Sequence, residues 1–233
     1  MLSLLAVVAV LATLVAFGAF IATRMRSGEA MPLSFRTILL VYLYLMCVAS
    51  FLVFTAGLSV GTKALLSNPF GREFSYHTYV PPAFPAPVDG AKTTPPEVRD
   101  EQVNRSTREA ERQYKNDLIQ GATLTILGGL IWGLHWYARR RMQSAADPSS
   151  QFFNKAYSAI LLAIFGIAGI VSLTTGVYDV LRYALLESDE FSGRNPPGSS
   201  IASAIVFVPC WFYYLTAVMS HSRQEQATRS TEA

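Results

Sequence analysis

Residues 37–66 read TILLVYLYLMCVASFLVFTAGLSVGTKALL, and this stretch decides the fold class. Its single charged residue is Lys63, close to the end of the stretch. A helix of about 20 residues crosses a hydrocarbon core of about 30 Å. A charge at the centre of that core costs about 2.5–3.5 kcal/mol. The stretch therefore predicts a membrane-spanning helix that keeps Lys63 near one membrane surface.

Four more stretches have the same apolar character: residues 2–23, 118–138, 156–186 and 200–220. Their only charged residues are Asp179 and Arg182, near the end of the third of these stretches. Only 15% of the 233 residues are charged, against about 25% in ordinary soluble domains. We therefore predict an all-α, polytopic membrane protein with five transmembrane helices.

The first stretch is read as a retained N-terminal anchor rather than a signal peptide. A signal peptide carries basic residues before a shorter apolar run, whereas here Arg24 and Arg26 follow the run. Basic residues after the span hold that end in the cytoplasm, which places the N-terminus outside.

The remaining loops predict the same orientation. The predicted cytoplasmic segments hold nine Lys and Arg against four Asp and Glu, and the rest of the chain holds ten against twelve. The run Arg139–Arg141 is the clearest cytoplasmic signal, and it places the C-terminus in the cytoplasm. The net charge of +3 expresses this bias, so no nucleic-acid partner is expected. Fifteen Arg against four Lys fit a bacterial gene, so the predicted location is the bacterial plasma membrane.

Residues 67–117 form the one large predicted outer loop. Its first part is rich in aromatic residues, which are expected to lie at the membrane surface or over the helix ends. A proline-rich linker follows, and then residues 97–117 carry oppositely charged residues four positions apart: Glu101 and Arg105, Arg105 and Glu109, and Glu111 and Lys115. That spacing predicts a solvated helix that continues into the third span.

A weak internal similarity predicts a duplication. A shift of 115 positions aligns Gly57 with Ser172 and Gly61 with Gly176. Because each copy contains two spans, the copies form parallel repeats. The predicted divisions are 1–34, the anchor and its cytoplasmic loop; 35–138, the first helix-pair repeat with the outer loop 67–117; and 139–233, the basic loop, second repeat and tail.

Small residues one helical turn apart predict where helices approach closely, because lipid offers no hydrophobic drive for association. Such pairs are Gly57 and Gly61, Gly129 and Gly133, and Ser172 and Gly176.

Three segments resemble a bacterial integral membrane family, domain of unknown function 5671. They are Tyr42-Leu43-Tyr44-Leu45, the run LIWGLHW at residues 130–136 before Arg139–Arg141, and Ala156-Tyr157 at the start of the fourth span. The resemblance covers about residues 35–222 and implies the membrane architecture without an activity.

No catalytic, cofactor or metal site is predicted. Gly57-Leu58-Ser59-Val60-Gly61 spells a nucleophile-elbow pattern, but it lies within an apolar helix instead of a strand-to-helix turn. The intramembrane charges form the one candidate polar site, a pair of Lys63 and Asp179 for which Arg182 competes. The alternative is that all three side chains reach the outer interface.

The leading functional hypothesis is a non-enzymatic accessory or scaffold subunit. It would contact the lipid bilayer and bind a protein partner, or a second copy, through its helix faces or residues 97–117. One alternative is a small transporter or channel, with Ser50, Thr55, Thr123, Thr125 and Ser158 lining a polar path. A second alternative is a membrane enzyme, which requires His77, Lys63, Asp179 and Glu187 to gather at the outer interface.

Overall fold

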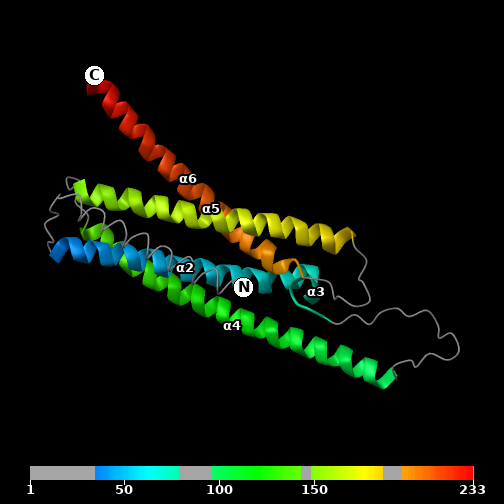
Figure 1. The fold of residues 1–233 in the computed structure, drawn as a ribbon. Helices are drawn as coiled ribbons and strands as arrows, with labels where there is room; N and C mark the ends of the chain where they lie inside the picture. Colours follow the sequence, from blue (N-terminus) through cyan, green and yellow to red (C-terminus); the bar gives the residue numbers. More distant parts are fainter. Residues whose placement is uncertain (1–34, 79–95, 143–147, 186–195, 233) are drawn as a thin grey trace, which may run out of the picture. The chain divides into compact units, whose positions relative to one another are not determined.

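The computed structural model describes the chain at residues 35–78, 96–142, 148–185 and 196–232. These ranges form helices that follow one another along the chain (Figure 1). They are α2 (Phe35–Phe70), α3 (Arg72–Ser75), α4 (Pro96–Met142), α5 (Pro148–Leu185) and α6 (Gly198–Glu232). Every regular element in the described ranges is a helix, which confirms the all-α fold class.

Four of the helices are long and apolar enough to cross a membrane. The candidate spans, each of which contains an apolar window of 18 residues, are Ile38–Phe70, Asp100–Met142, Phe153–Leu185 and Gly198–Ser220. They coincide with the second to fifth predicted spans, because long charge-free runs leave a helix as the structure that satisfies the backbone in lipid. The first predicted span, at residues 2–23, lies outside the described residues, so the count of five stays a prediction.

Helix α4 is continuous from its charged half into its apolar half, as the sequence predicts. It runs for 47 residues without an internal proline. Two of the predicted charge pairs form on its surface, Glu101 with Arg105 at 2.7 Å and Glu111 with Lys115 at 3.4 Å. A single helix therefore joins residues 97–117 to the third span.

Contacts divide the chain into two units, which cut across the helices. The described part of unit 1 lies within Met1–Thr55, Thr125–Ile167 and Pro209–Ala233. Unit 2 comprises Ala56–Leu124 and Ala168–Val208. The predicted helix-pair repeats and their boundaries remain predictions.

Aromatic rings fill the core of unit 1. The ring of Phe51 on α2 lies 5.4 Å from Trp132, 5.5 Å from Phe165 and 6.1 Å from Tyr214, measured between ring centroids. Pairs of this kind contribute about 0.5–1.5 kcal/mol beyond the area that they bury. One side chain from each of the four long helices therefore meets in this core.

Two free cysteines lie in the predicted spans. Cys47 is buried and Cys210 is half-buried, and neither forms a disulfide. Free thiols at such positions pack as small apolar side chains.

In unit 2 the backbones of α2 and α4 make a close approach. A Cβ atom on Gly121 would lie 2.6 Å from the Gly61 nitrogen and 3.2 Å from the Gly57 carbonyl oxygen. The Ser59 and Ser203 hydroxyls form a buried hydrogen bond of 2.9 Å between α2 and α6. The small face of Gly57 and Gly61 thus packs a helix, as its spacing indicates.

The other predicted helix-packing residues differ in how closely a neighbouring side chain or backbone approaches them. A Cβ on Gly129 would meet the Phe54 ring at 3.2 Å in unit 1, and one on Gly176 would meet Ser200 at 3.5 Å in unit 2. Among the described residues, a Cβ on Gly133 would meet nothing within 4 Å. That Gly133 packs against a neighbouring helix stays a prediction, because the motif fixes the spacing of small residues and not the position of the neighbour. Ser172 is half-buried on α5.

Candidate functional site

Unit 2 contains a cluster of charged and aromatic side chains, called here the Lys63 cluster: Lys63, Arg72, Tyr76, Glu111, Tyr114 and Asp117. Lys63 stands near the end of the apolar part of α2, and Asp117 directly precedes the apolar part of α4. The Lys63 ammonium donates a hydrogen bond of 2.8 Å to Asp117, and the two side chains are 23% and 16% exposed. The pair is therefore partly shielded from water.

A second ion pair joins α3 to α4. Arg72 forms a salt bridge of 3.3 Å to Glu111, and its guanidinium stacks 3.3 Å from the centroid of the Tyr114 ring. Tyr114 donates a hydrogen bond of 3.3 Å to Asn68. Lys63 contacts Asp117, whereas Asn68, which is later in α2, contacts Tyr114, which is earlier in α4. The two helices therefore run antiparallel here.

A turn at Gly71 brings Tyr76 back over this cluster. Gly71 has φ of 87°, which glycine adopts without strain. After α3, the Ser75 hydroxyl donates a hydrogen bond of 2.9 Å to the Lys63 carbonyl oxygen. Tyr76 is only 1% exposed, and the Lys63 ammonium lies 4.5 Å from the centroid of its ring. The aromatic segment thus covers the helix ends, one of the two positions expected for it.

The Tyr76 hydroxyl is buried near the Asp117 carboxylate but makes no hydrogen bond of standard geometry within the described part of the chain. Burial raises the pKa of this phenol, and the nearby Asp117 carboxylate raises it further. Both effects disfavour the phenolate, because a second negative charge would be desolvated beside the first. Tyr76 therefore stays a neutral hydroxyl at physiological pH.

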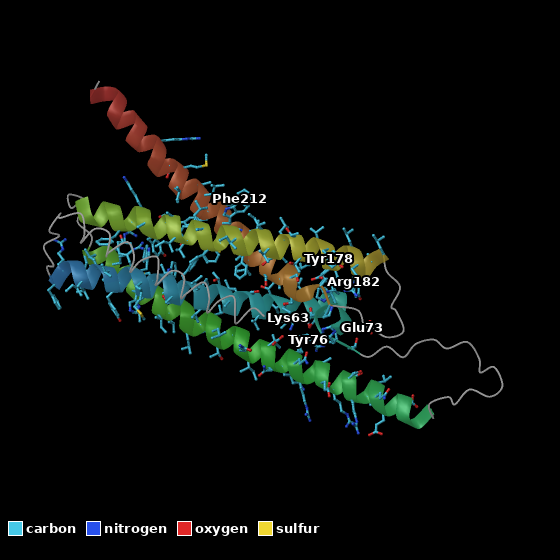
Figure 2. All side chains as sticks on the ribbon, viewed as in Figure 1. Lys63, Glu73, Tyr76, Tyr178, Arg182 and Phe212 are labelled. Atoms are coloured by element: carbon cyan, nitrogen blue, oxygen red, sulfur yellow. The ribbon has the colours of Figure 1, made fainter. Side chains whose placement is uncertain are left out.

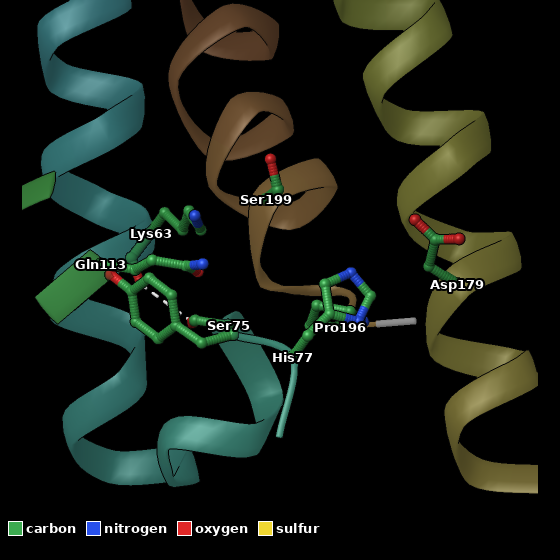
Figure 3. Close-up of a pocket in the computed structure, with 8 residues that line it drawn as sticks. Lys63, Ser75, His77, Gln113, Asp179, Pro196 and Ser199 are labelled. Atoms are coloured by element: carbon green, nitrogen blue, oxygen red, sulfur yellow. Dashed lines mark hydrogen bonds between the residues drawn. The ribbon is translucent and has the colours of Figure 1, made fainter. Parts of the chain in front are cut away.

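A cavity of about 270 Å³ opens beside the cluster (Figure 3). The residues that line it come from both sequence halves of unit 2: Lys63, Ser75, Tyr76, His77, Gln113, Asp179, Pro196 and Ser199. Asp179 accepts a hydrogen bond of 2.8 Å from the Ser200 hydroxyl. The cavity is therefore lined by the ammonium of a lysine, a carboxylate, an imidazole and several neutral hydrogen-bonding groups.

The structure corrects the predicted pairing of the intramembrane charges. Lys63 and Asp179 line the same cavity, but Lys63 pairs with Asp117 and Asp179 bonds to Ser200. The alignment of the two predicted repeats placed Tyr178, next to Asp179, opposite Lys63, and it left Asp117 in the predicted outer loop 67–117. Arg182 is half-buried on α5 and is absent from the residues that line the cavity (Figure 2).

The described residues do not form a recognisable catalytic or metal centre. No three His, Cys, Asp or Glu side chains gather within the described ranges. Ser59 lies in the middle of α2 and bonds to Ser203, so it is not on a nucleophile elbow. Glu187, one of the four residues required for the enzyme hypothesis, lies outside the described residues.

Helix α4 exposes most of its surface in both halves. Only 11% of its most apolar window is buried within the protein, against 39% for α2. Large apolar side chains repeat at helical spacing on its exposed surface: Ile119, Ile126, Leu130, Leu134 and Tyr137. Towards the N-terminus the same spacing continues through exposed charged residues, among them Arg105, Arg108 and Arg112. We call this surface the α4 face.

The hydroxyls considered for a polar path bond mainly to their own helices. Ser50 donates to the Met46 carbonyl, and Ser158 donates 3.0 Å to the Asn154 carbonyl. Thr55 likewise bonds to the Phe51 carbonyl at 3.0 Å. Thr123 is exposed on α4. The hydroxyls of Ser50, Thr55 and Ser158 therefore satisfy hydrogen bonds within their own helices, as hydroxyls in apolar helices commonly do.

Comparison with known proteins identifies one family. Residues 100–196 match the model of the family described as Domain of unknown function (DUF5671). The match lies within the region that resembles this family by sequence and confirms the resemblance; it takes in most of α4 and all of α5. No curated protein and no solved structure matches the chain.

Proposed function

We propose that this chain, which carries a domain of unknown function of the DUF5671 family, is a non-enzymatic accessory or scaffold subunit of a membrane assembly. It resides in the bacterial plasma membrane with its N-terminus outside and its C-terminus in the cytoplasm. The basic run Arg139–Arg141 at the end of α4 supports this orientation. In this orientation residues 97–117 project into the external space.

The α4 face is the observation that carries the proposal. Its apolar part lets lipid or another helix pack against α4, and its charged part adds electrostatic selection of the partner. Because Arg105, Arg108 and Arg112 recur on this face, the partner is expected to present acidic side chains above the membrane. A second copy of the chain is the other occupant that the test must distinguish.

The unit 1 core favours this function over a transporter. A conducting path needs polar groups directed into the bundle, whereas Phe51, Trp132, Phe165 and Tyr214 meet in the centre of unit 1. Three of the five candidate hydroxyls for such a path, those of Ser50, Thr55 and Ser158, bond to helix carbonyls instead.

A second candidate function, an enzyme at the outer interface, rests on the cavity of unit 2. Lys63, His77 and Asp179 all line it, and these are three of the four residues which that hypothesis requires. A turnover assay has no defined substrate, so ligand binding at this cavity is the first property to test.

The docking function is tested by reversing two charges of the α4 face. Purification in mild detergent, followed by mass measurement of the intact particle, is expected to show a stoichiometric partner or a homo-oligomer. Arg108→Glu with Arg112→Glu is expected to lower its recovery about tenfold, because like charges across an interface oppose association. Arg223→Glu, an exposed charge on α6, serves as the matched control.

Two outcomes contradict the proposal. One is a monomer in every detergent and in native membranes. The other is equal recovery of the complex with the wild-type chain and with the doubly reversed variant, which would exclude the α4 face as the interface.

A further inference from the structure

The cavity of unit 2 lies at a level where apolar side chains are still exposed. Leu65, two residues from Lys63 on α2, is 60% exposed, and Tyr178, next to Asp179 on α5, is 62% exposed. Val177 and Leu173, which precede Asp179 on α5, are 52% and 49% exposed. Exposed apolar side chains of this kind face the hydrocarbon of a bilayer. A molecule that enters the cavity from this side is therefore a membrane lipid.

The cavity presents donors and an acceptor that the protein leaves partly unused. The Lys63 ammonium has three N–H donors, and the described residues accept one of them at Asp117. Asp179 accepts one hydrogen bond from Ser200, although a carboxylate has about four acceptor positions. An occupant with an anionic group could accept the remaining Lys63 hydrogen bonds. A cationic group on the same occupant could donate to the remaining acceptor positions of Asp179.

Tyr76 supplies an independent sign that a ligand belongs here. It lines the cavity, it is 1% exposed, and its hydroxyl makes no hydrogen bond of standard geometry within the described residues. A buried hydroxyl without a partner is unfavourable, since it loses its hydrogen bonds to water on folding. An anionic oxygen in the cavity would accept the hydrogen bond that this phenol has available.

The donors indicate a phosphate for the anionic group, and the acceptor indicates an amine for the cationic group. Lys63, Tyr76 and Gln113 offer several donors to one anion, which suits the several oxygens of a phosphate. Asp179 accepts N–H hydrogen bonds, which a primary ammonium can donate and a quaternary ammonium cannot. The volume of about 270 Å³ lies just below the usual range for small-molecule sites, about 300–1,000 Å³, and fits a headgroup.

We propose that this cavity binds a phosphoethanolamine group, with its ammonium on Asp179 and its phosphate on Lys63 and Tyr76. The group belongs to the headgroup of a zwitterionic phospholipid whose acyl chains run towards the membrane interior along Val177 and Leu173, which are exposed on α5. The same chemistry occurs in free phosphoethanolamine, so the test separates the two sources. This inference concerns a different surface from the α4 face and stands or falls separately from the docking function.

The first arm of the test measures lipid selectivity. The purified full chain is placed in nanodiscs of equal parts phosphatidylethanolamine, phosphatidylcholine and phosphatidylglycerol, and the lipids retained on release are identified by native mass spectrometry. The wild-type chain is expected to retain phosphatidylethanolamine over both other lipids. Phosphatidylcholine is the informative competitor, because it has the same phosphate but no ammonium N–H.

Asp179→Asn is expected to lower retention of phosphatidylethanolamine about tenfold, since it removes the charge that holds the ammonium. The amide still offers an oxygen to Ser200, so the side-chain shape is kept. Asp100→Asn, an exposed carboxylate on α4 outside the cavity, is the matched control and is expected to change nothing. Tyr76→Phe is a second variant that removes only an unpartnered hydroxyl, and it is expected to lower retention about threefold.

The second arm tests the free compound. Thermal unfolding is measured in phosphatidylcholine and phosphatidylglycerol nanodiscs with millimolar phosphoethanolamine. Lipid selectivity without thermal protection assigns the site to the lipid headgroup, and protection that Asp179→Asn abolishes assigns it to the soluble compound. Equal retention of the three lipids together with no protection would overturn the proposal. So would a response in either arm that Asp179→Asn and Tyr76→Phe both leave unchanged.

Discussion

Replacing Gly121 by alanine is expected to destabilise unit 2 by about 2 kcal/mol, because the new methyl group meets the backbone of α2. Its Cβ would lie 2.6 Å from the Gly61 nitrogen and 2.8 Å from the Gly61 Cα. Neither atom belongs to a flexible side chain, so α2 and α4 must separate. The better helix propensity of alanine, about 1 kcal/mol, offsets only part of the loss. Unfolding in detergent, followed by circular dichroism, measures the change.

Gly133→Ala is the matched control on the same helix. A methyl group there meets no described residue within 4 Å, so the gain in helix propensity is unopposed and stability is expected to stay equal or to rise by up to about 1 kcal/mol. Equal losses for Gly121→Ala and Gly133→Ala would show that the close approach of α2 and α4 is not what makes glycine necessary at residue 121.

Replacing Lys63 by methionine is expected to cost about 3 kcal/mol, because it leaves the Asp117 carboxylate partly buried without its cation. The two side chains are 23% and 16% exposed, so water replaces only part of the lost interaction. The same unfolding assay measures the effect. The double variant Lys63→Met with Asp117→Leu is expected to recover much of the loss, since no unpaired charge remains.

An exposed pair provides the comparison for this second prediction. Arg105 and Glu101 form a salt bridge of 2.7 Å, but their side chains are 72% and 63% exposed. Arg105→Met is therefore expected to change stability by less than about 0.5 kcal/mol. If Lys63→Met has an equally small effect, the Lys63–Asp117 pair is solvated and does not stabilise unit 2.

The helices that carry the apolar runs were predictable because charge is costly in lipid. The absence of charge over residues 118–138 and 200–220 leaves a membrane helix as the simple solution. The continuation of α4 into residues 97–117 was also predictable, since no proline or glycine interrupts the pattern of charges four positions apart.

The partner of Lys63 could have been predicted from the level in the membrane at which each charged residue is expected. Lys63 precedes the end of one apolar run, and Asp117 precedes the start of the next. Consecutive spans that run antiparallel bring these two positions to the same level. The similarity between the two predicted repeats pointed to Asp179 instead, because it compares positions in two copies and not neighbours in space.

Gly121 and Tyr76 could not be identified from the sequence. Gly121 has no glycine four positions away, since Asp117 and Thr125 occupy those positions, so it is not part of a Gly-x-x-x-Gly pattern. Tyr76 resembles the other aromatic residues of its segment, and only the turn at Gly71 buries it. Periodicity along one element does not report which face a distant element covers.

The central claim is that α4 crosses the membrane with its charged half outside, and labelling of single cysteines tests it most directly. Cys47 and Cys210 are first replaced by alanine, and Asn104→Cys and Arg140→Cys, both at exposed positions of α4, are introduced separately. In intact cells an impermeant maleimide is expected to label residue 104 and to reach residue 140 only after permeabilisation. Labelling of both residues in intact cells, or of residue 140 alone, would contradict the account.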